Sequence, residues 1–228
     1  SDVSFHVNAG EIVGMFGLLG AGQVEVTKAI FGIEPATSGE ITMLGKPLRA
    51  KTPHDAKQAQ IGFVPEDRKV DGLIADMDVA ENLTLANWGK LSRNGIIRRS
   101  LVRQRAMQWV ERLKIRTTGG IQQEVRTLSG GNQQKVVLAR WLEVGCRLLL
   151  LNEPTRGVDV GARADIYTVL ESLREQGLGL VLVSSDMEEI LAMSNRILVF
   201  AKGQLVTECD PAQTNQEVLL AAAAGGDV

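Results

Sequence analysis

Short apolar runs alternate with helical patterns along most of this chain, and this alternation restricts the fold more than any other feature. The runs have the length of buried strands and lie at residues 12–16, 61–64, 148–151, 180–184 and 197–200. Apolar residues recur with helical spacing at about residues 22–31, 163–176 and 187–193. Strands and helices that alternate in this way predict an α/β fold with a parallel sheet.

The pattern changes between residues 76 and 145, where the apolar spacing is helical. Trp109, Val110 and Leu113 share one predicted helix face there. We therefore expect residues 1–75 and 146–220 to form the α/β core and residues 76–145 an inserted helical subdomain. Alternating polar and apolar residues at 3–7 predict a half-buried strand, and the small residues at 221–228 predict a flexible tail.

Composition argues against two classes of partner. The chain has 25 Lys and Arg against 27 Asp and Glu, and no basic block exceeds a few residues, which does not favour nucleic-acid binding. No apolar run approaches the ~20 residues of a membrane span.

Cys146 and Cys209 form no CxxC motif and are expected to be reduced thiols of a cytosolic protein. Because the first residue is not Met and the sequence starts within a strand pattern, we expect a fragment of a longer polypeptide.

A glycine-rich loop lies between a predicted strand and a predicted helix. Its expected phosphate-binding residues are Gly17, Gly20, Ala21, Gly22, Gln23 and Val24. Glycines let main-chain N–H groups face a phosphate, and the helix N-terminus adds positive potential. A loop of this kind that supports hydrolysis ends in Lys followed by Ser or Thr. Gln23 brings no charge and Val24 cannot bind Mg²⁺, so the sequence predicts nucleotide contact through the backbone and inefficient hydrolysis.

A second loop, Leu128-Ser129-Gly130-Gly131-Asn132-Gln133-Gln134-Lys135, precedes another predicted helix. Ser129 is expected to be the N-cap residue, and Gly130 and Gly131 allow a close approach to the backbone. A hydroxyl, exposed amides and the helix dipole together favour a phosphate. An ordinary capped helix would explain Ser-Gly-Gly alone, whereas the complete octapeptide is far more specific.

Polar residues follow the apolar run at 148–151. Asn152 and Glu153 are expected at the carboxyl end of a strand, where ligands bind in α/β sheets. A site that organises Mg²⁺ would have Asp in place of Asn152, and Glu153 is suited to act as a general base. A solvated carboxylate at a strand end is the alternative for Glu153. Asp159, before the next helix, either caps that helix or reaches across a dimer interface.

The ordered set of motifs resembles the ATP-binding-cassette (ABC) ATPases over nearly the whole chain. In more detail it is similar to the C-terminal nucleotide-binding domain of bacterial sugar importers of the ribose, galactose, xylose and autoinducer type. The resemblance implies a P-loop NTPase core that is RecA-like and mostly parallel, with an antiparallel β edge. Residues 64–69, 128–135 and 152–162 carry most of it.

The resemblance also implies roles for residues. Residues 17–24 match the Walker A loop, 148–153 Walker B and 156–159 the D-loop. Glu66 stands where the family usually has the Gln of the Q-loop, and Ser185 where a catalytic switch His is expected. Ser129, Gly130, Gly131 and Gln133 match the signature that contacts a partner's ATP. Departures from the hydrolysing pattern thus occur at Gln23, Val24, Glu66, Asn152 and Ser185.

Two such domains meet head to tail in this family, so the expected cofactor is ATP, with Mg²⁺ doubtful at this chain's own site. The expected partners are a second nucleotide-binding domain, N-terminal in the same polypeptide, and permease subunits. A periplasmic sugar-binding protein is an indirect partner, and nucleic acid is not expected. The location implied is the cytoplasmic face of the bacterial inner membrane.

Three alternatives remain open at this point. The first is a soluble cassette ATPase of DNA repair or translation. The second is a nucleotide-binding regulatory or interaction module without a part in hydrolysis. The third is a plain α/β scaffold domain.

Overall fold

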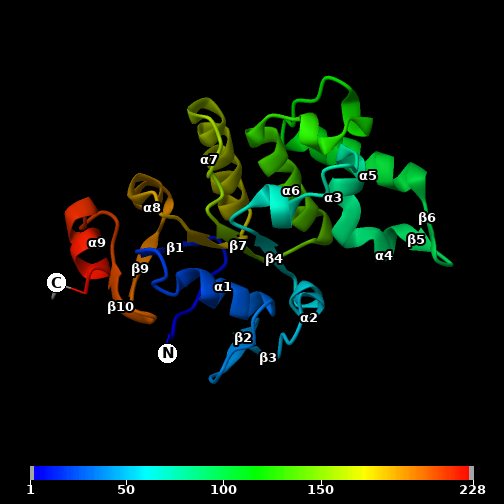
Figure 1. Ribbon diagram of the computed structural model, residues 1–228. Coiled ribbons are helices and arrows are strands. Elements are labelled where there is room, and N and C mark those ends of the chain that lie inside the picture. Colours follow the sequence, from blue (N-terminus) through cyan, green and yellow to red (C-terminus); the bar gives the residue numbers. More distant parts are fainter. Residues whose placement is uncertain (1–2, 226–228) are drawn as a thin grey trace. The chain divides into compact units, whose positions relative to one another are not determined.

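The computed structural model describes residues 3–225, and the chain divides into two compact units (Figure 1). The first, here called the sheet unit, consists of Ser1–Phe63, Arg147–Pro154 and Glu171–Val228. The second, the helical unit, consists of Val64–Cys146 and Thr155–Leu170.

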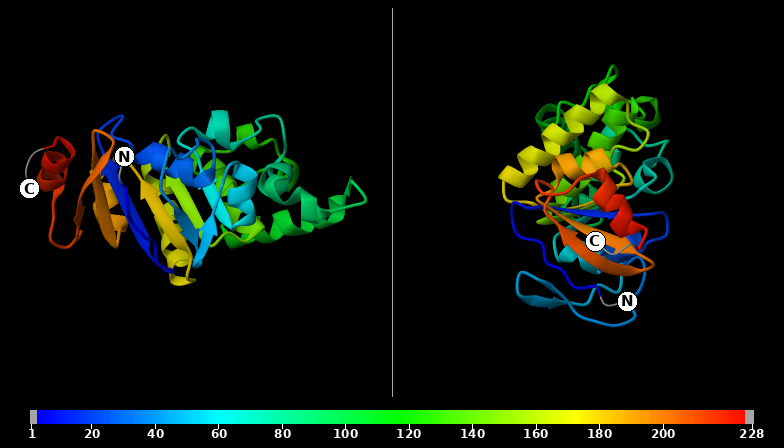
Figure 2. Two further views of the ribbon diagram at one scale, coloured as in Figure 1. Left: turned by 90° about the horizontal axis from the view of Figure 1, so that it is seen from below. Right: turned by 90° about the vertical axis from the view of Figure 1, so that its left-hand side faces the viewer.

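A six-stranded sheet forms the centre of the sheet unit, with the strand order β10-β9-β1-β8-β7-β4. Its strands are β1 Ile12–Gly17, β4 Ile61–Val64, β7 Leu148–Asn152, β8 Gly179–Val183, β9 Arg196–Ala201 and β10 Gln204–Cys209. In the left view of Figure 2, the blue β1 lies between the orange pair β9 and β10 and the yellow β8. Almost every residue of β1, β7 and β8 is buried, because a sheet covered on both faces leaves its strands no solvent side.

The pairing of these strands is mostly parallel. β1 pairs in parallel with β8 and β9, and β7 pairs in parallel with β8. At the edge, β10 pairs antiparallel with β9, and the register shifts between Leu205 and Thr207. The predicted mostly parallel sheet with an antiparallel edge is therefore confirmed.

Helices cover both faces of this sheet. The unit contains α1 Gln23–Phe31, α2 Pro53–Gln58, α8 Met187–Met193, α9 Gln216–Ala223 and a hairpin of β2 Ile41–Met43 and β3 Lys46–Leu48. A Cβ on Gly14 of β1 would lie 2.2 Å from Ser194 Oγ and 3.4 Å from Ile190 of α8, so a side chain there would displace Ser194. Asn152 of β7 lies in the same row of the sheet as Met15 of β1. Both side chains therefore point to the face opposite to that of Gly14. Thr27 of α1 contacts Asn152, so α1 and α8 lie on opposite faces.

The helical unit is built around α6 (Gly130–Val144), most of whose residues are buried. It also contains α3 Val79–Thr84, α4 Trp88–Leu91, α5 Arg99–Arg112, the first part of α7 (Val160–Glu175), the π-helical turn η1 Arg68–Gly72 and the 3₁₀ turns η2 Leu85–Asn87, η3 Gly120–Gln122 and η4 Val125–Thr127. α3 begins with a reciprocal capping box between Asp78 and Glu81, and both α3 and α5 pack against α6. No helix within residues 3–225 is long and apolar enough to cross a membrane.

A β-hairpin interrupts the stretch for which the sequence predicted helical structure alone. β5 (Ser92–Arg93) pairs antiparallel with β6 (Ile96–Ile97). Asn94 and Gly95 between them have φ values of 54° and 78°. Asn-Gly is the strongest short-range hairpin signal, because both residues tolerate positive φ, so this element was predictable from the sequence.

The predicted strand at residues 3–7 is wrong, although its alternating exposure is present. Val3, Phe5 and Val7 are half-buried and the residues between them exposed, yet residues 3–8 form no strand. Side chains hold this backbone: Arg196 donates to the His6 carbonyl, and the Asn8 N–H donates to a carboxylate.

The first residues of the predicted tail, 221–223, are helical and not flexible. α9 extends through Ala223, and Leu219, Ala222 and Ala223 are buried. These small and apolar side chains recur with helical spacing, and α9 packs against β9. The last positions of the predicted tail, 226–228, lie outside the described residues.

Glu143 of α6 supplies the first testable prediction. Its carboxylate has no exposed surface and accepts hydrogen bonds from Arg105 Nε at 3.1 Å, Trp109 Nε1 at 2.7 Å and Asn87 Nδ2 at 2.8 Å. Glu143→Ala leaves these donors unpaired, so we expect urea unfolding to show a loss of about 2–4 kcal/mol in stability. The exposed Glu111→Ala is the control, with an expected change within about 0.5 kcal/mol. Equal losses for the two variants would contradict this account.

Candidate functional site

The loop between β1 and α1 is closed by its own main chain. The Ala21 N–H donates to the Leu18 carbonyl at 2.9 Å, and Gly20 and Gly22 have φ values of 77° and 108°, which glycine adopts without strain. Gly22 is the N-cap residue of α1, and no side chain caps the helix there. Main-chain N–H groups at this end of α1 are therefore available to an anion.

Gln23 turns back into this loop. Its Nε2 donates to the Gly17 carbonyl at 3.1 Å, and its buried Oε1 has no hydrogen-bond partner among residues 3–225. A Cβ on Gly17 would lie 2.8 Å from the Ala21 Cβ, so glycine is required there too. Val24 adds no polar side-chain atom. A neutral amide thus braces the loop at the position where a hydrolysing loop carries a lysine.

Asn152, at the end of β7, is buried against Thr27 of α1. Thr27 Oγ1 lies 2.9 Å from Asn152 Oδ1 and 2.8 Å from the Val24 carbonyl. A hydroxyl has one proton, so if it donates to Val24, the Asn152 amide turns its NH₂ toward Thr27. In either orientation the Thr27 hydroxyl and the Asn152 amide form a hydrogen bond with each other, and neither group is charged. Thr27 was not among the residues predicted from the sequence, because its burial depends on the packing of α1 on the sheet.

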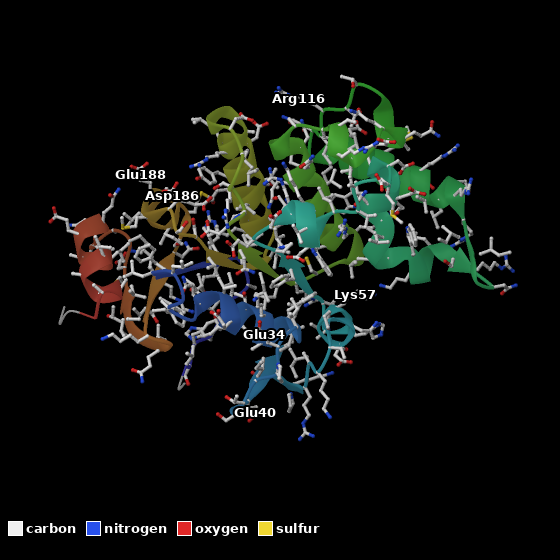
Figure 3. All side chains as sticks on the ribbon, viewed as in Figure 1. Glu34, Glu40, Lys57, Arg116, Asp186 and Glu188 are labelled. Carbon is white, nitrogen blue, oxygen red and sulfur yellow. The ribbon has the colours of Figure 1, made fainter. Side chains whose placement is uncertain are left out.

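Glu153 is held in place by the end of β8. Its N–H donates to the Val183 carbonyl at 2.8 Å, and its Oε1 accepts from the Ser185 N–H at 2.6 Å. The φ of Glu153 is 48°, a left-handed conformation that costs a residue other than glycine on the order of 1 kcal/mol. Asp186, labelled in Figure 3, then caps α8 by accepting from the Glu188 N–H. The sheet unit thus brings the glycine-rich loop, Asn152, Glu153 and Ser185 to one edge of its sheet.

Ser129 is the N-cap residue of α6, as the sequence predicts, but its side chain does not bond the α6 main chain. Its Oγ instead accepts from Asn132 Nδ2 at 2.8 Å. A Cβ on Gly131 would come within 2.5 Å of the Ala162 Cβ, which excludes any larger residue. The N-terminus of the 15-residue α6 therefore carries a hydroxyl and no side-chain cap, a favourable arrangement for an anion.

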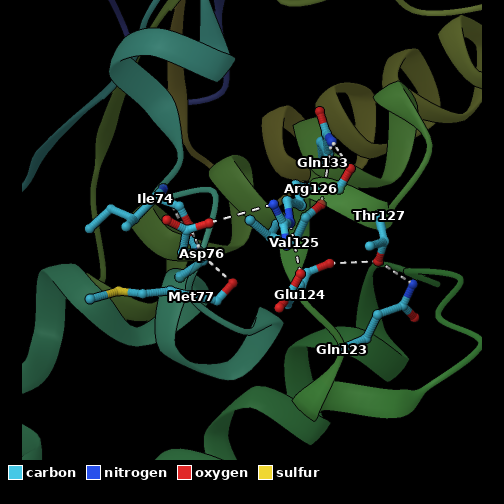
Figure 4. A network of polar contacts seen from close by, with 10 residues as sticks. Ile74, Asp76, Met77, Gln123, Glu124, Val125, Arg126, Thr127 and Gln133 are labelled. Carbon is cyan, nitrogen blue, oxygen red and sulfur yellow. Dashed lines mark hydrogen bonds and ion pairs between the residues drawn. The ribbon is translucent and has the colours of Figure 1, made fainter.

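Gln133 is buried and supports the segment that precedes the signature. Its Nε2 lies 3.2 to 3.4 Å from the carbonyl oxygens of Val125, Arg126 and Leu128 (Figure 4). The side chain is thus used within this unit, and the role of Gln133 toward a partner's ATP stays a prediction.

Arg68, on the π-helical turn η1, joins the signature to the turn before α7. Its Nη1 and Nη2 donate to the Arg156 and Gly157 carbonyls at 2.6 and 2.9 Å. A Cβ on Gly130 would lie 2.7 Å from Arg68 Nη2 and 2.8 Å from the Gly157 oxygen. Burial lowers the pKa of the Arg68 guanidinium, and the nearby Asp67 partly opposes this shift. The sequence analysis missed Arg68, although it lies in the 64–69 motif.

The remaining predicted residues of the helical unit lie around the same turn. Glu66 forms an ion pair with Arg156. Asp159 caps α7, since its Oδ1 accepts from the Ala162 N–H at 2.9 Å. The capping alternative for Asp159 is therefore realised, and its interface role stays a prediction. The helical unit thus contains Glu66, the N-terminus of α6 at Ser129–Gly131, and Asp159 at the start of α7. Arg68 and Arg156 connect the first and last of these segments through hydrogen bonds and an ion pair.

Comparison with known proteins points to one family. A family model described as ABC transporter matches residues 1–156. The chain is 46% identical over 226 residues to a ribose import ATP-binding protein of Rubrobacter xylanophilus, covering 99% of this chain and 45% of that protein. It is also 46% identical over 226 residues to a putative ribose/galactose/methyl galactoside import ATP-binding protein of Agrobacterium fabrum, with the same coverage. The chain spans about half the length of these curated relatives.

Solved structures agree on the fold. A nucleotide-free ATP-binding cassette from an ABC transporter has a TM-score of 0.80 and 21% identity, covering 97% of this chain and 87% of that chain. The dimeric bacterial ABC transporter cassette MJ0796 has a TM-score of 0.75 and 24% identity, covering 92% and 89%. The predicted P-loop NTPase-type fold class is therefore confirmed.

Arg68→Met tests the junction between the signature and the turn at residues 155–158. The variant removes both hydrogen bonds to that turn, so local opening becomes easier. We expect hydrogen exchange of the Val158 amide, which donates to the Thr155 carbonyl, to become about tenfold faster. The exposed neighbour Lys69→Met is the control and is expected to leave this exchange unchanged. A rate in Arg68→Met equal to wild type would show that Arg68 does not hold the turn.

Proposed function

The chain belongs to the ABC transporter family, and we propose that it is the C-terminal nucleotide-binding domain of a bacterial sugar importer. Its similarity to ribose and ribose/galactose import proteins supports the substrate class. Since the chain covers 45% of those relatives, a second cassette in the same polypeptide is the natural partner. ATP-driven closure of the two domains acts on permease subunits at the cytoplasmic face of the inner membrane. A periplasmic sugar-binding protein supplies the sugar.

One contrast carries the mechanistic part of this proposal. The glycine-rich loop has a neutral, buried Gln23 where charge is needed, whereas Ser129, Gly130 and Gly131 present a hydroxyl at an uncapped helix N-terminus. In a head-to-tail pair, each ATP lies between one domain's phosphate loop and the other domain's signature. This chain therefore contributes mainly in trans, to the γ-phosphate of the ATP held by its partner.

Mg²⁺ does not fit the residues at this chain's own loop. The Val24 side chain has no oxygen atom, its carbonyl faces Thr27, and the Asn152 amide is bound to Thr27. Mg²⁺ prefers carboxylate and hydroxyl oxygens together with water and phosphate. Glu153 and Ser185, the catalytic candidates, therefore contribute little hydrolysis at this loop. Nucleotide binds there through the main chain of Gly17, Gly20, Ala21 and Gly22, with Gln23 and Val24 as weak contributors.

Exposed aliphatic side chains beside both candidate loops support a partner surface. Leu19, in the glycine-rich loop of the sheet unit, is fully exposed. Val160, in the helical unit, follows Asp159 and is 85% exposed. Burial of these two side chains on a partner would remove apolar surface from water, which is favourable, and Val160 is next to Asp159, for which an interface role is proposed.

A second candidate function is a nucleotide-binding regulatory module that takes no part in hydrolysis. The uncharged Gln23 side chain and the lack of a side-chain hydroxyl at Val24 favour it. It differs from the proposed function in one measurable respect, because it needs no contribution from Ser129 to turnover.

Ser129→Ala and Glu153→Gln separate the two roles in the full transporter. Loss of one oriented donor to a transferring phosphoryl group is expected to lower ATPase kcat and sugar uptake about a hundredfold in Ser129→Ala. Glu153→Gln is expected to change kcat by less than about threefold, since this chain's own loop supports little hydrolysis. The exposed Ser100→Ala is the control, with wild-type turnover expected.

Unimpaired turnover in Ser129→Ala would rule out the trans-acting role and favour the regulatory module. A large loss in Glu153→Gln would show that this chain's own loop hydrolyses ATP. Substitutions of Gly130 are less informative, because even a Cβ there meets the Gly157 carbonyl oxygen at 2.8 Å and disturbs the fold.

A further inference from the structure

The side-chain amide of Asn132 has a determined orientation. One of its terminal atoms lies 2.8 Å from the main-chain N of Arg116, which follows α5 and is labelled in Figure 3. A main-chain N–H only donates, so the Asn132 atom that faces it is the oxygen Oδ1. The NH₂ group of Asn132 then faces Ser129 Oγ at 2.8 Å. The usual ambiguity between the oxygen and nitrogen of an amide is thereby removed.

This orientation determines what the Ser129 hydroxyl does. The amide nitrogen Asn132 Nδ2 can donate a hydrogen bond but cannot accept one. Ser129 Oγ therefore accepts from it and must direct its own proton elsewhere. Ser129 is exposed, and its side chain does not cap α6. Among residues 3–225, no hydrogen bond takes up the Ser129 proton. The hydroxyl is thus left as a donor at the N-terminus of α6.

We propose that Asn132 is a positioning residue that holds the Ser129 hydroxyl as a donor to a phosphate oxygen at this helix end. The inference rests on the proposed function, in which the phosphate is the γ-phosphate of the partner's ATP. A donor whose direction is set before the phosphate arrives needs no reorientation during phosphoryl transfer, which is the basis of electrostatic preorganisation. Asn132 reaches the phosphate only through Ser129.

The competing explanation is a structural tie, in which Asn132 merely fastens the Arg116 segment to α6. Asn132→Asp distinguishes the two. A carboxylate still accepts from the Arg116 N–H, so the tie remains. The atom that faces Ser129, however, changes from a donor to an acceptor, and the Ser129 proton turns inward.

The experiment measures ATPase kcat and KM of Asn132→Ala and Asn132→Asp in the full transporter, with thermal unfolding recorded for each. We expect kcat to fall about fivefold in Asn132→Ala, which leaves the hydroxyl free to rotate, and about fiftyfold or more in Asn132→Asp. KM for ATP is expected to change less than kcat. A structural tie predicts the reverse order, with Asn132→Asp close to wild type, and that order would overturn the proposal.

Gln123→Ala is the matched control. Gln123 makes the same kind of bridge, because its Oε1 accepts from the Thr118 N–H at 2.9 Å and its Nε2 donates to Thr127 Oγ1 at 2.7 Å (Figure 4). Within the described part of the chain, no hydrogen bond joins Gln123 to Ser129. We expect its stability to fall about as much as that of Asn132→Ala, with turnover unchanged.

A double-mutant cycle closes the test. In the Ser129→Ala background there is no hydroxyl to direct, so adding Asn132→Ala should lower kcat by less than about twofold. A full multiplicative loss would overturn the positioning role and leave the proposed function standing. If Ser129→Ala alone turns over normally, the proposed function fails and the inference fails with it. A second cycle adds Asn132→Asp to Ser129→Ala. Any fall in kcat that this addition causes cannot act through the hydroxyl, so it measures the effect of the added charge alone.

Discussion

The parallel register of β1, β8 and β7 is the constraint on which the sheet unit depends. It aligns Met15, Val183 and Asn152 in one row, so their chains leave the sheet at the same edge. Glu153 then reaches the Val183 carbonyl and the Ser185 N–H, and Asn152 meets Thr27 of α1. A slip of one residue would turn Asn152 to the opposite face and separate these groups. The glycine-rich loop begins at the same edge, and the neutral side chain of Gln23 donates a hydrogen bond back to the Gly17 carbonyl of this loop.

The helical unit depends on a different device, in which side chains set the directions of groups on neighbouring loops. Arg68 holds the Arg156 and Gly157 carbonyls beside Gly130, and Asn132 directs the Ser129 hydroxyl. In the proposed mechanism the two units contribute unequally to ATP turnover. In the sheet unit, Gln23 and Asn152 are neutral amides that bond inside the protein. In the helical unit, a hydroxyl and a helix N-terminus remain available to a phosphate outside it.

Much of the fold was predictable from the sequence, because buried strands have a local signature. The apolar runs at 61–64 and 148–151 became β4 and β7 almost residue for residue, and the capping position of Ser129 was found from its neighbours alone. The partners of the site residues were not predictable. Arg68 lies 89 positions from Gly157, and Thr27 lies 125 from Asn152, so these contacts depend on register and packing rather than on local pattern. The strand expected at 3–7 failed for the same reason, since alternating exposure does not supply a pairing partner.

The central claim is that the ATP turned over by the transporter is held by the partner's phosphate loop and by this chain's signature. Trapping the full transporter with 8-azido-ATP, Mg²⁺ and vanadate, followed by mapping of the labelled peptides, tests it most directly. The account predicts that trapped label lies on the partner domain that holds the ATP, and that trapping there is lost when this chain carries Ser129→Ala. Equal trapping at residues 17–24 of this chain would contradict it, because those residues would then hold a hydrolysing site of their own.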